Sequence, residues 1–180
     1  MGRDPERRFV EIYESAYASI LGYALRRCPD PDDAADVVAE TFTVAWRRID
    51  EVPQGEEARL WLFGVARRVL ANHRRGERRH GQRTAVLRGQ LAASPVLDEP
   101  SVEDYSRVGN VLRGLSDGDR ELLTLVAWEN LDTREIARVL GVSRNAAAVR
   151  LYRARRRFAR DLAKAGIDHP GLIAVEGRPL

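Results

Sequence analysis

The sequence is poor in several residue types, and each shortage excludes a class of structure or site. Cys28 is the only cysteine, which rules out an internal disulfide and a zinc site built on cysteines. No uninterrupted apolar run approaches the ~18 residues that a membrane-spanning helix needs, and the N-terminal MGRDPERRF lacks the apolar centre of a signal peptide. We therefore expect a protein without a membrane segment that works in the reducing environment of the cytoplasm.

Aromatic residues are also scarce, at 7% of the chain, whereas charged residues make up 32% and apolar residues 44%. This balance favours helices with hydrated outer faces over a disordered or membrane-embedded chain. Glycine-rich phosphate loops and nucleophile elbows are missing, and no two of His73, His80 and His169 have the helical spacing of a metal site. We expect an all-α protein that is not an enzyme and binds no cofactor or metal.

Charge is segregated along the chain, although the formal net charge is only +3. Between Arg67 and Arg88 there are eight arginines and one acid, Glu77, and a second basic block runs from Arg144 to Arg160. Acidic residues gather instead at positions 30–40 and 98–104. This distribution predicts two surfaces that face a polyanion and one surface for a different partner, although any single run is also compatible with an ordinary solvated helix face.

Apolar residues at three- and four-residue spacing predict three helices, over residues 5–28, from the cap at Asp30 to about Ile49, and over residues 58–79. The polar stretch 50–57, with Pro53 and Gly55, is expected to be non-helical. The three apolar stripes are expected to form one shared core, with both Trp46 and Trp61 inside it. The residues expected to face inward are Phe9, Ile12, Tyr13, Ala16, Tyr17, Ile20, Ala24 and Leu25, then Ala35, Val38, Phe42, Ala45, Trp46 and Ile49, then Leu62, Val65, Ala66, Val69 and Leu70.

The helical periodicity fades between residues 81 and 101, where small, polar and proline residues accumulate. A connection of this length is unusual inside a compact domain, so the chain is expected to form two small helical domains joined by a flexible linker. We predict a first domain over residues 5–80, a linker over 81–101, a second domain over 102–165 and a flexible tail over 166–180. In the second domain, Ser116 is expected to cap a helix.

The segment from Leu131 to Phe158 has the local signals of a helix-turn-helix. Asp132 and Glu135 form a capping-box pair that starts a short helix, and Gly141 can adopt the left-handed conformation that ends it. Ser143 then caps a second helix two residues later. Helices joined by so short a turn cross steeply, and in proteins that bind DNA the second helix of this motif enters the major groove.

The outward side of this second helix is rich in arginine, and few acids lie nearby in the sequence to pair with it. Arginine can bond guanine edges and small apolar side chains can meet the thymine methyl group, so base reading is expected of Ala148, Val149, Tyr152 and Arg153. Other arginines and the Ser143 hydroxyl are expected to hold phosphates, which fix the register without reading sequence. The complete expected set is Ser143, Arg144, Asn145, Ala148, Val149, Arg150, Tyr152, Arg153, Arg155 and Arg156, with Arg157 also assigned to phosphate.

Three segments together resemble the sigma-70 family of transcription initiation factors. The run DPDDAADVVAETFTVAWRRI is similar to the segment that binds the coiled coil of the largest polymerase subunit, and ARLWLFGVARRVLANHRRGERR is similar to the element that melts and reads minus-10 DNA. LSDGDRELLTLVAWENLDTREIARVLGVSRNAAAVRLYRARRRF resembles the domain that reads the minus-35 element. Their order, with only a linker between them, resembles the extracytoplasmic-function (group IV) class.

The resemblance implies a sigma factor that binds core RNA polymerase at the largest-subunit coiled coil and the flap, recognises promoter DNA and initiates transcription. It assigns polymerase binding to Asp36, Glu40, Thr43 and Arg47, and minus-10 binding to Arg67, Arg68, Asn72 and Arg75. It also implies that Asn72 and the loop before Ala58 together hold an unstacked base. An anti-sigma factor as a further partner stays open.

Two other interpretations remain open on the sequence alone. A helix-turn-helix also serves repressors and activators that bind operators, but the first domain shows no clear ligand pocket, phosphoacceptor or dimer seam. An enzyme with a magnesium site is suggested only by the aspartates at positions 30–36, which are more simply helix-capping residues. Copurification with core polymerase separates a sigma factor from an operator-binding regulator.

Overall fold

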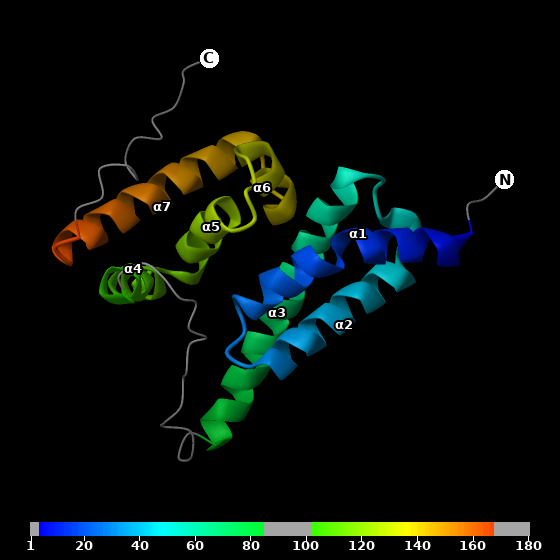
Figure 1. Cartoon of the computed structure of the whole chain (residues 1–180), viewed down its shortest axis with the longest axis horizontal. Coiled ribbons are helices and arrows are strands. Elements are labelled where there is room, and N and C mark those ends of the chain that lie inside the picture. Colours follow the sequence, from blue (N-terminus) through cyan, green and yellow to red (C-terminus); the bar gives the residue numbers. More distant parts are fainter. Residues whose placement is uncertain (1–3, 85–101, 168–180) are drawn as a thin grey trace. The chain divides into compact units, whose positions relative to one another are not determined.

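The computed structural model describes residues 4–84 and 102–167, and the side chains of residues 4–75 and 107–167. Within those ranges it contains seven α-helices, one short 3-10 helix and no strand (Figure 1). The chain divides into two compact units, Met1–Pro95 and Val96–Leu180. The prediction of an all-α protein is confirmed.

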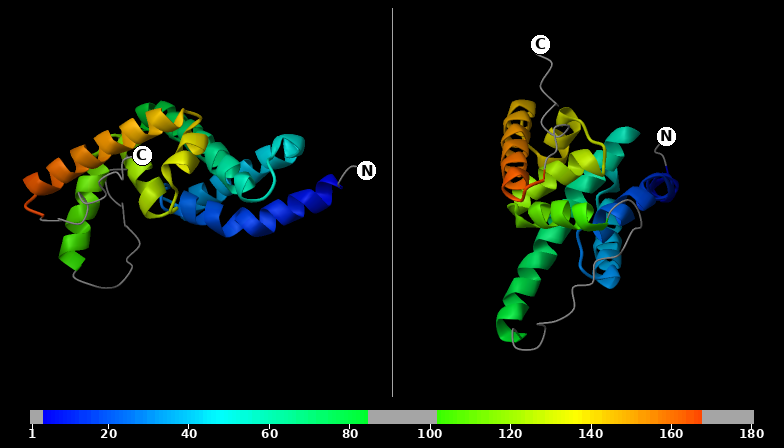
Figure 2. Two further views of the ribbon diagram at one scale, coloured as in Figure 1. Left: turned by 90° about the horizontal axis from the view of Figure 1, so that it is seen from above. Right: turned by 60° about the vertical axis from the view of Figure 1, so that its left-hand side comes forward.

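The first unit is a bundle of α1 (Pro5–Leu25), α2 (Pro31–Arg47) and α3 (Glu56–Thr84), with the 3-10 helix η1 (Ile49–Glu51) between α2 and α3. The three α-helices all contact one another, and the last turns of α3 project beyond the other two (Figure 2). Asp4 and Asp30 each accept a hydrogen bond from the backbone N–H two residues on, and a proline follows each of them. The prediction that Asp30 caps the second helix is therefore confirmed.

The core of the first unit lies where its three helices meet, and the predicted inward residues of α3 are all buried there. The side chains without exposed surface include Ile20, Tyr23 and Ala24 of α1, Val37 and Ala45 of α2, and Leu62 and Phe63 of α3. On α1 and α2 the predicted stripe is wrong at Tyr13, Tyr17, Leu25, Ala35 and Trp46, which are exposed. Each helix touches its two neighbours over a limited arc, so apolar residues at the edges of a wide stripe remain at the surface.

The connection between α2 and α3 is shorter and more ordered than the sequence predicted. Residues 49–51 form η1, and α3 begins at Glu56, two residues before the expected start. At its other end α3 continues through residues 81–84, which were assigned to the linker. The rest of that linker and the tail from residue 168 onward lie outside the described residues.

The second unit contains α4 (Val102–Gly114), α5 (Asp117–Ala127), α6 (Thr133–Leu140) and α7 (Arg144–Lys164). α7 packs against all three of the others, with α6 at its N-terminal end (Figure 1). Ser116 caps α5 as predicted, because its hydroxyl accepts a hydrogen bond from the Asp119 backbone N–H at 3.2 Å. Leu115, Phe158, Leu162 and Ile167 form an apolar cluster against which Val108 and Leu112 of α4 pack.

The helix-turn-helix forms through the local signals that predicted it. Asp132 and Glu135 make a reciprocal capping box at the start of α6. Gly141 ends α6 with φ of 65°, and the Val142 N–H donates back to the Ala137 carbonyl at 2.9 Å. The Ser143 hydroxyl then accepts the Ala146 N–H at 3.2 Å and starts α7. In the crossing, Ile136 and Ala147 have no exposed surface, so the two helices meet in a dry, close contact.

Candidate nucleic-acid interface

α7 presents two chemically different sides. Its buried side carries Ala147, Leu151, Ala154, Phe158 and Leu162, which pack into the second unit. Its opposite side exposes Asn145, Ala148, Val149, Tyr152, Arg153 and Arg156, all of which were expected to face DNA. Tyr152 is 61% exposed and Val149 is 41% exposed, so apolar surface lies among the arginines. Such a mixed face suits the grooves of DNA, where cations meet phosphates and apolar groups meet bases.

The arginines of α7 differ in whether an acid already neutralises them. Arg157 bonds both carboxylate oxygens of Asp119 on α5, at 2.8 and 2.9 Å. Among the described residues, none forms an ion pair with Arg144, Arg150 or Arg153. The sequence prediction that Arg157 holds a phosphate overlooked Asp119, which lies 38 residues earlier in the chain.

In the C-terminal turns of α7, basic side chains pair with an acid of the same helix. Arg160 and Lys164 both contact Asp161, at 3.3 and 3.4 Å. Desolvation tends to raise the pKa of Asp161, but the hydrogen bonds from Arg160 and Lys164 outweigh it and lower that pKa below its ordinary value.

The Arg156 guanidinium lies 5.9 Å from the centre of the Tyr152 ring. A hollow of about 520 Å³ lies along this face, lined by Tyr152, Arg153, Arg156, Arg157 and Arg160.

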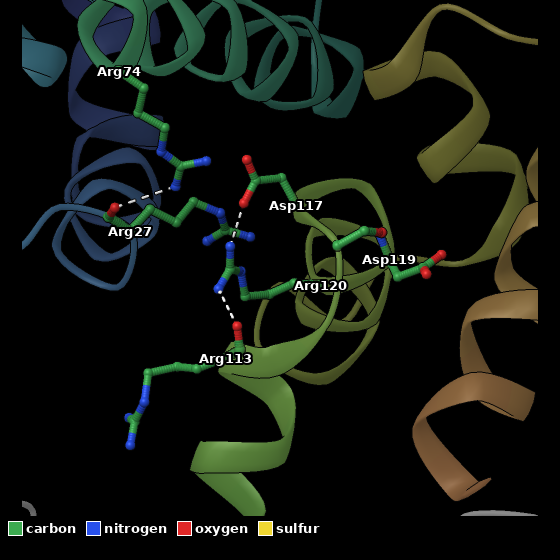
Figure 3. A network of polar contacts seen from close by, with 7 residues as sticks. Arg27, Arg74, Arg113, Asp117, Asp119 and Arg120 are labelled. Carbon is green, nitrogen blue, oxygen red and sulfur yellow. Dashed lines mark hydrogen bonds and ion pairs between the residues drawn. The ribbon is translucent and has the colours of Figure 1, made fainter. Parts of the chain in front are cut away.

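A second basic face runs along α3. Arg67, Arg68, Asn72 and Arg75, the residues expected at the minus-10 element, are all exposed. The Arg75 guanidinium donates to the Asn72 side-chain oxygen at 3.5 Å. Arg74 lies next to this set, but its guanidinium is directed toward the end of α1, where it donates to the Arg27 carbonyl at 3.4 Å (Figure 3). The exposed set therefore forms one surface along the middle of α3.

The loop before α3 does not meet Asn72. Asn72 follows Ala58 by 14 residues on the same helix, which corresponds to about 21 Å along the axis. The loop also starts from a fixed point, because Val52 is 2% exposed and its carbonyl accepts a hydrogen bond from Arg8 on α1. A pocket of about 310 Å³ beside the loop is lined by α1 and the first turn of α3, without Asn72. The loop and Asn72 line no common pocket among the described residues, and the expectation that they together hold one base stays a prediction.

The turn between α2 and α3 is braced by a local ion pair. The Arg48 guanidinium donates to both side-chain oxygens of Glu51, which lowers the pKa of the Glu51 carboxyl and raises the pKa of Arg48. Arg48 also lies 5.9 Å from the centre of the Trp61 ring. Trp61 is partly buried, whereas the sequence prediction placed it inside the core. The contact between Arg48 and Trp61 joins the end of α2 to the start of α3.

The outer face of α2 carries the residues expected to bind polymerase. Asp36, Glu40, Thr43 and Arg47 are all exposed, and their three- and four-residue spacing places them in one row. At one edge of this row the His73 ring lies 3.5 Å from the Glu40 carboxylate, so the row borders α3. The row is therefore accessible along the whole of α2.

An exposed aromatic patch borders the same row on its α1 side, and the sequence prediction missed it because it placed these residues in the core. Trp46, Tyr13 and Tyr17 are 45%, 40% and 37% exposed. The Phe9 and Trp46 rings are 5.3 Å apart, and the Tyr13 and Tyr17 rings are 5.0 Å apart, so the patch is continuous. Contiguous exposed apolar surface of this kind marks protein interaction sites.

No group of His, Cys, Asp or Glu within residues 4–75 and 107–167, whose side chains the structure describes, is arranged to hold a metal ion. In the same ranges, no helix combines the length and apolar character that crossing a membrane requires.

Two family models match the chain in the order of its two units. The model described as Sigma-70 region 2 matches residues 12–80, and the model described as Sigma-70, region 4 matches residues 105–158. The first match covers most of α1, all of α2 and most of α3, including both the basic face of α3 and the outer face of α2. The second covers the helix-turn-helix.

Curated relatives are similar over most of their length. The RNA polymerase sigma factor CnrH of Cupriavidus metallidurans is 32% identical, with 86% of each chain covered. The RNA polymerase sigma-E factor of Streptomyces coelicolor is 29% identical, with 93% of each chain covered. The ECF RNA polymerase sigma factor SigL of Mycobacterium tuberculosis is also 29% identical, covering 87% of this chain and 89% of that protein.

Solved structures agree with these relatives. CnrH in complex with the cytosolic domain of CnrY matches with a TM-score of 0.60 and 25% identity, over 88% of this chain and 90% of that chain. The sigma factor RpoE of Bartonella quintana, solved with the anti-sigma factor NepR, shares the fold with a TM-score of 0.60 and 22% identity. With a region 2 unit, a region 4 helix-turn-helix and relatives matched nearly end to end, the chain belongs to the sigma-70 family, as an RNA polymerase sigma factor of the extracytoplasmic-function type.

Proposed function

We propose that α7 reads the minus-35 element, that α3 binds the minus-10 element, and that the outer face of α2 binds core RNA polymerase in the cytoplasm. The observation that carries the proposal is the exposed face of α7, where unpaired arginines and apolar side chains follow a capped helix-turn-helix. The chain performs no catalysis of its own in this function. It directs the polymerase to a start site.

On α7, the residues that contact bases are those on the side opposite the buried one. Arg153 is exposed and belongs to the arginines that the described residues leave unpaired, so its guanidinium is available for a bidentate contact with guanine. Val149 and Ala148 offer small apolar surface for thymine methyl groups. Arg144 and Arg150, together with the Ser143 hydroxyl, hold phosphates on either side of the groove.

On α3, the four exposed residues form a cationic surface with one amide. Arg67, Arg68 and Arg75 attract the phosphates of the minus-10 strand, and the Asn72 amide supplies both a donor and an acceptor for a base edge.

On α2, the polymerase site combines the charged row with the neighbouring aromatic patch. Protein interfaces gain most of their binding energy from a few aromatic or arginine anchors, surrounded by polar residues that set orientation. Trp46 and Tyr13 are suited to anchor, and Asp36 and Glu40 are suited to pair with basic residues of the largest-subunit coiled coil. By similarity to the family, the second unit meets the polymerase flap.

An anti-sigma factor is proposed as a second protein partner. Both similar structures were solved as complexes of a sigma factor with an anti-sigma protein or its cytosolic domain. A surface that binds polymerase can also be covered by an inhibitor, which then competes with core enzyme for it.

The decisive experiment is reconstituted run-off transcription on genomic DNA fragments with core polymerase of the same bacterium. The expected result is transcription from defined start sites that depends on the added chain. Failure to confer start-site selection, together with binding of a palindromic operator as a dimer, would instead indicate a conventional regulator.

We expect Asp36→Lys to weaken binding to core polymerase by tenfold or more. A reversed charge at an electrostatically complementary interface places like charges opposite each other, and a tenfold loss corresponds to about 1.4 kcal/mol of binding free energy. Binding is measured by titrating labelled chain with core enzyme at low and moderate salt. Glu11→Lys is the matched control, since Glu11 is exposed on α1 outside the row and makes only an ion pair with Arg7 one turn away. Equal losses in both variants would contradict the assignment of this face.

A further inference from the structure

Among the described residues, one ion pair joins α7 to α5. Asp119 is 9% exposed, and its two carboxylate oxygens accept hydrogen bonds from the Arg157 Nη1 at 2.8 and 2.9 Å. We infer that Asp119 is a positioning residue for promoter reading: through Arg157 it fixes the rotation of α7 and so the direction in which Arg153 enters the groove. This inference rests on the proposed minus-35 role of α7.

Apolar residues also join α5 and α7 to the core of the second unit. Leu122 and Leu125 of α5 and Leu151 and Ala154 of α7 are all buried, and the two helices are in contact. Hydrophobic burial scales with area and is non-directional, so it tolerates small rotations of one helix against another. A charge-assisted hydrogen bond to a planar guanidinium has a defined geometry. The ion pair therefore adds the directional restraint that the apolar contact lacks.

Asp119 is itself held in place by its surroundings. Its backbone N–H is bonded to the Ser116 hydroxyl that caps α5, at 3.2 Å. The next residue, Arg120, bonds the Arg113 carbonyl at 3.0 Å and the Asp117 carboxylate (Figure 3). The start of α5 is thus attached to the end of α4 before Asp119 contacts α7, and a carboxylate in the first turn of a helix is also favourable. The carboxylate is a fixed point rather than a mobile surface group.

Arg157 is suited to transmit this restraint to the DNA-reading face. It follows Arg153 by four residues, so the two side chains lie one above the other on the same side of the helix. A rotation of α7 that broke the ion pair would move Arg153, Val149 and Tyr152 together.

The alternative role for Arg157 is a phosphate contact, and the two roles predict opposite salt dependence. Loss of a phosphate-binding arginine weakens all DNA about equally and reduces the slope of log affinity against log salt by about one. Loss of an arginine that is already neutralised leaves that slope unchanged. Arg150 is the matched control, since it is exposed on the same helix and no ion pair is found for it within the described residues.

The test uses full-length chain with core polymerase on a promoter mapped by run-off transcription, with its minus-35 element either intact or scrambled. We expect Arg157→Gln and Asp119→Asn each to reduce the preference for the intact element about three- to tenfold, as for a weakened base contact. The magnitude of the slope of log affinity against log salt should stay unchanged in Arg157→Gln. It should increase by about one in Asp119→Asn, because that variant frees the Arg157 cation to bind DNA. Arg150→Gln should lower the slope by about one and keep the preference.

Two further measurements keep the interpretation specific. A loss of folding would reduce transcription from both promoters alike, and it appears in circular dichroism and thermal unfolding of each variant. The double variant should discriminate no worse than either single variant, because both remove the same restraint. If Arg157→Gln weakens both promoters equally with a lower salt slope, or if Asp119→Asn keeps the preference, the positioning role is wrong.

Arg153→Ala in the same assay tests the proposed function separately, since its failure to reduce the preference would contradict minus-35 reading by α7 itself.

Discussion

Arg153→Ala is expected to reduce open-complex formation on promoters with an intact minus-35 element by about five- to hundredfold, which corresponds to the ~1–3 kcal/mol of a discriminating base contact. The physical reason is the position of Arg153 on the exposed side of α7, without an ion pair among the described residues. A guanidinium that is free of internal partners loses nothing inside the protein when it bonds guanine. The effect is measured on a series of promoters that differ by single base pairs in the upstream element.

The pattern of losses across that series is more informative than their size. Arg153→Ala should remove the preference at one or two positions and leave the others unchanged, because one side chain reads one or two base pairs. Arg150→Ala is the control and should weaken every promoter by a similar factor. If the two variants gave the same profile across the series, the division of α7 into a base-reading row and phosphate-binding flanks would be wrong.

Ile136→Ala is expected to destabilise the second unit by about 2–5 kcal/mol, the usual cost of deleting a buried isoleucine side chain. Ile136 has no exposed surface and lies where α6 crosses α7, so the neighbouring helices cannot close the cavity without changing the crossing. Small domains are stable by only about 5–15 kcal/mol, so much of the second unit should unfold near physiological temperature. Circular dichroism during thermal unfolding measures the loss.

This variant also tests whether the two units act separately. Because the proposed α2 site belongs to the first unit, binding to core polymerase through α2 should persist, weakened only by the loss of the proposed flap contact, while minus-35 recognition is lost. Val149→Ala is the control for stability: Val149 is 41% exposed, so its truncation should change the unfolding temperature little. Complete loss of core binding in Ile136→Ala, with the first unit still folded, would contradict the assignment of the main polymerase site to α2.

The local elements were predictable because their signals lie within a few residues of each other. The capping box of Asp132 and Glu135, the turn at Gly141 and the caps at Asp30, Ser116 and Ser143 all form as predicted. A cap needs only a side chain and a backbone N–H two or three residues away, so the sequence contains the whole interaction. The exposed faces of α7 and α3 follow from the same helical periodicity.

The sequence by itself determined the helical class, the helix-turn-helix and the rows of residues on α2, α3 and α7 that face outward. Only the tertiary structure decided how wide the buried arc of each helix is, which leaves Tyr13, Tyr17 and Trp46 at the surface. It also decided that Arg157 meets Asp119. Periodicity gives the direction of a side chain from its own helix, whereas a contact between distant segments depends on how the helices pack, which no local pattern records.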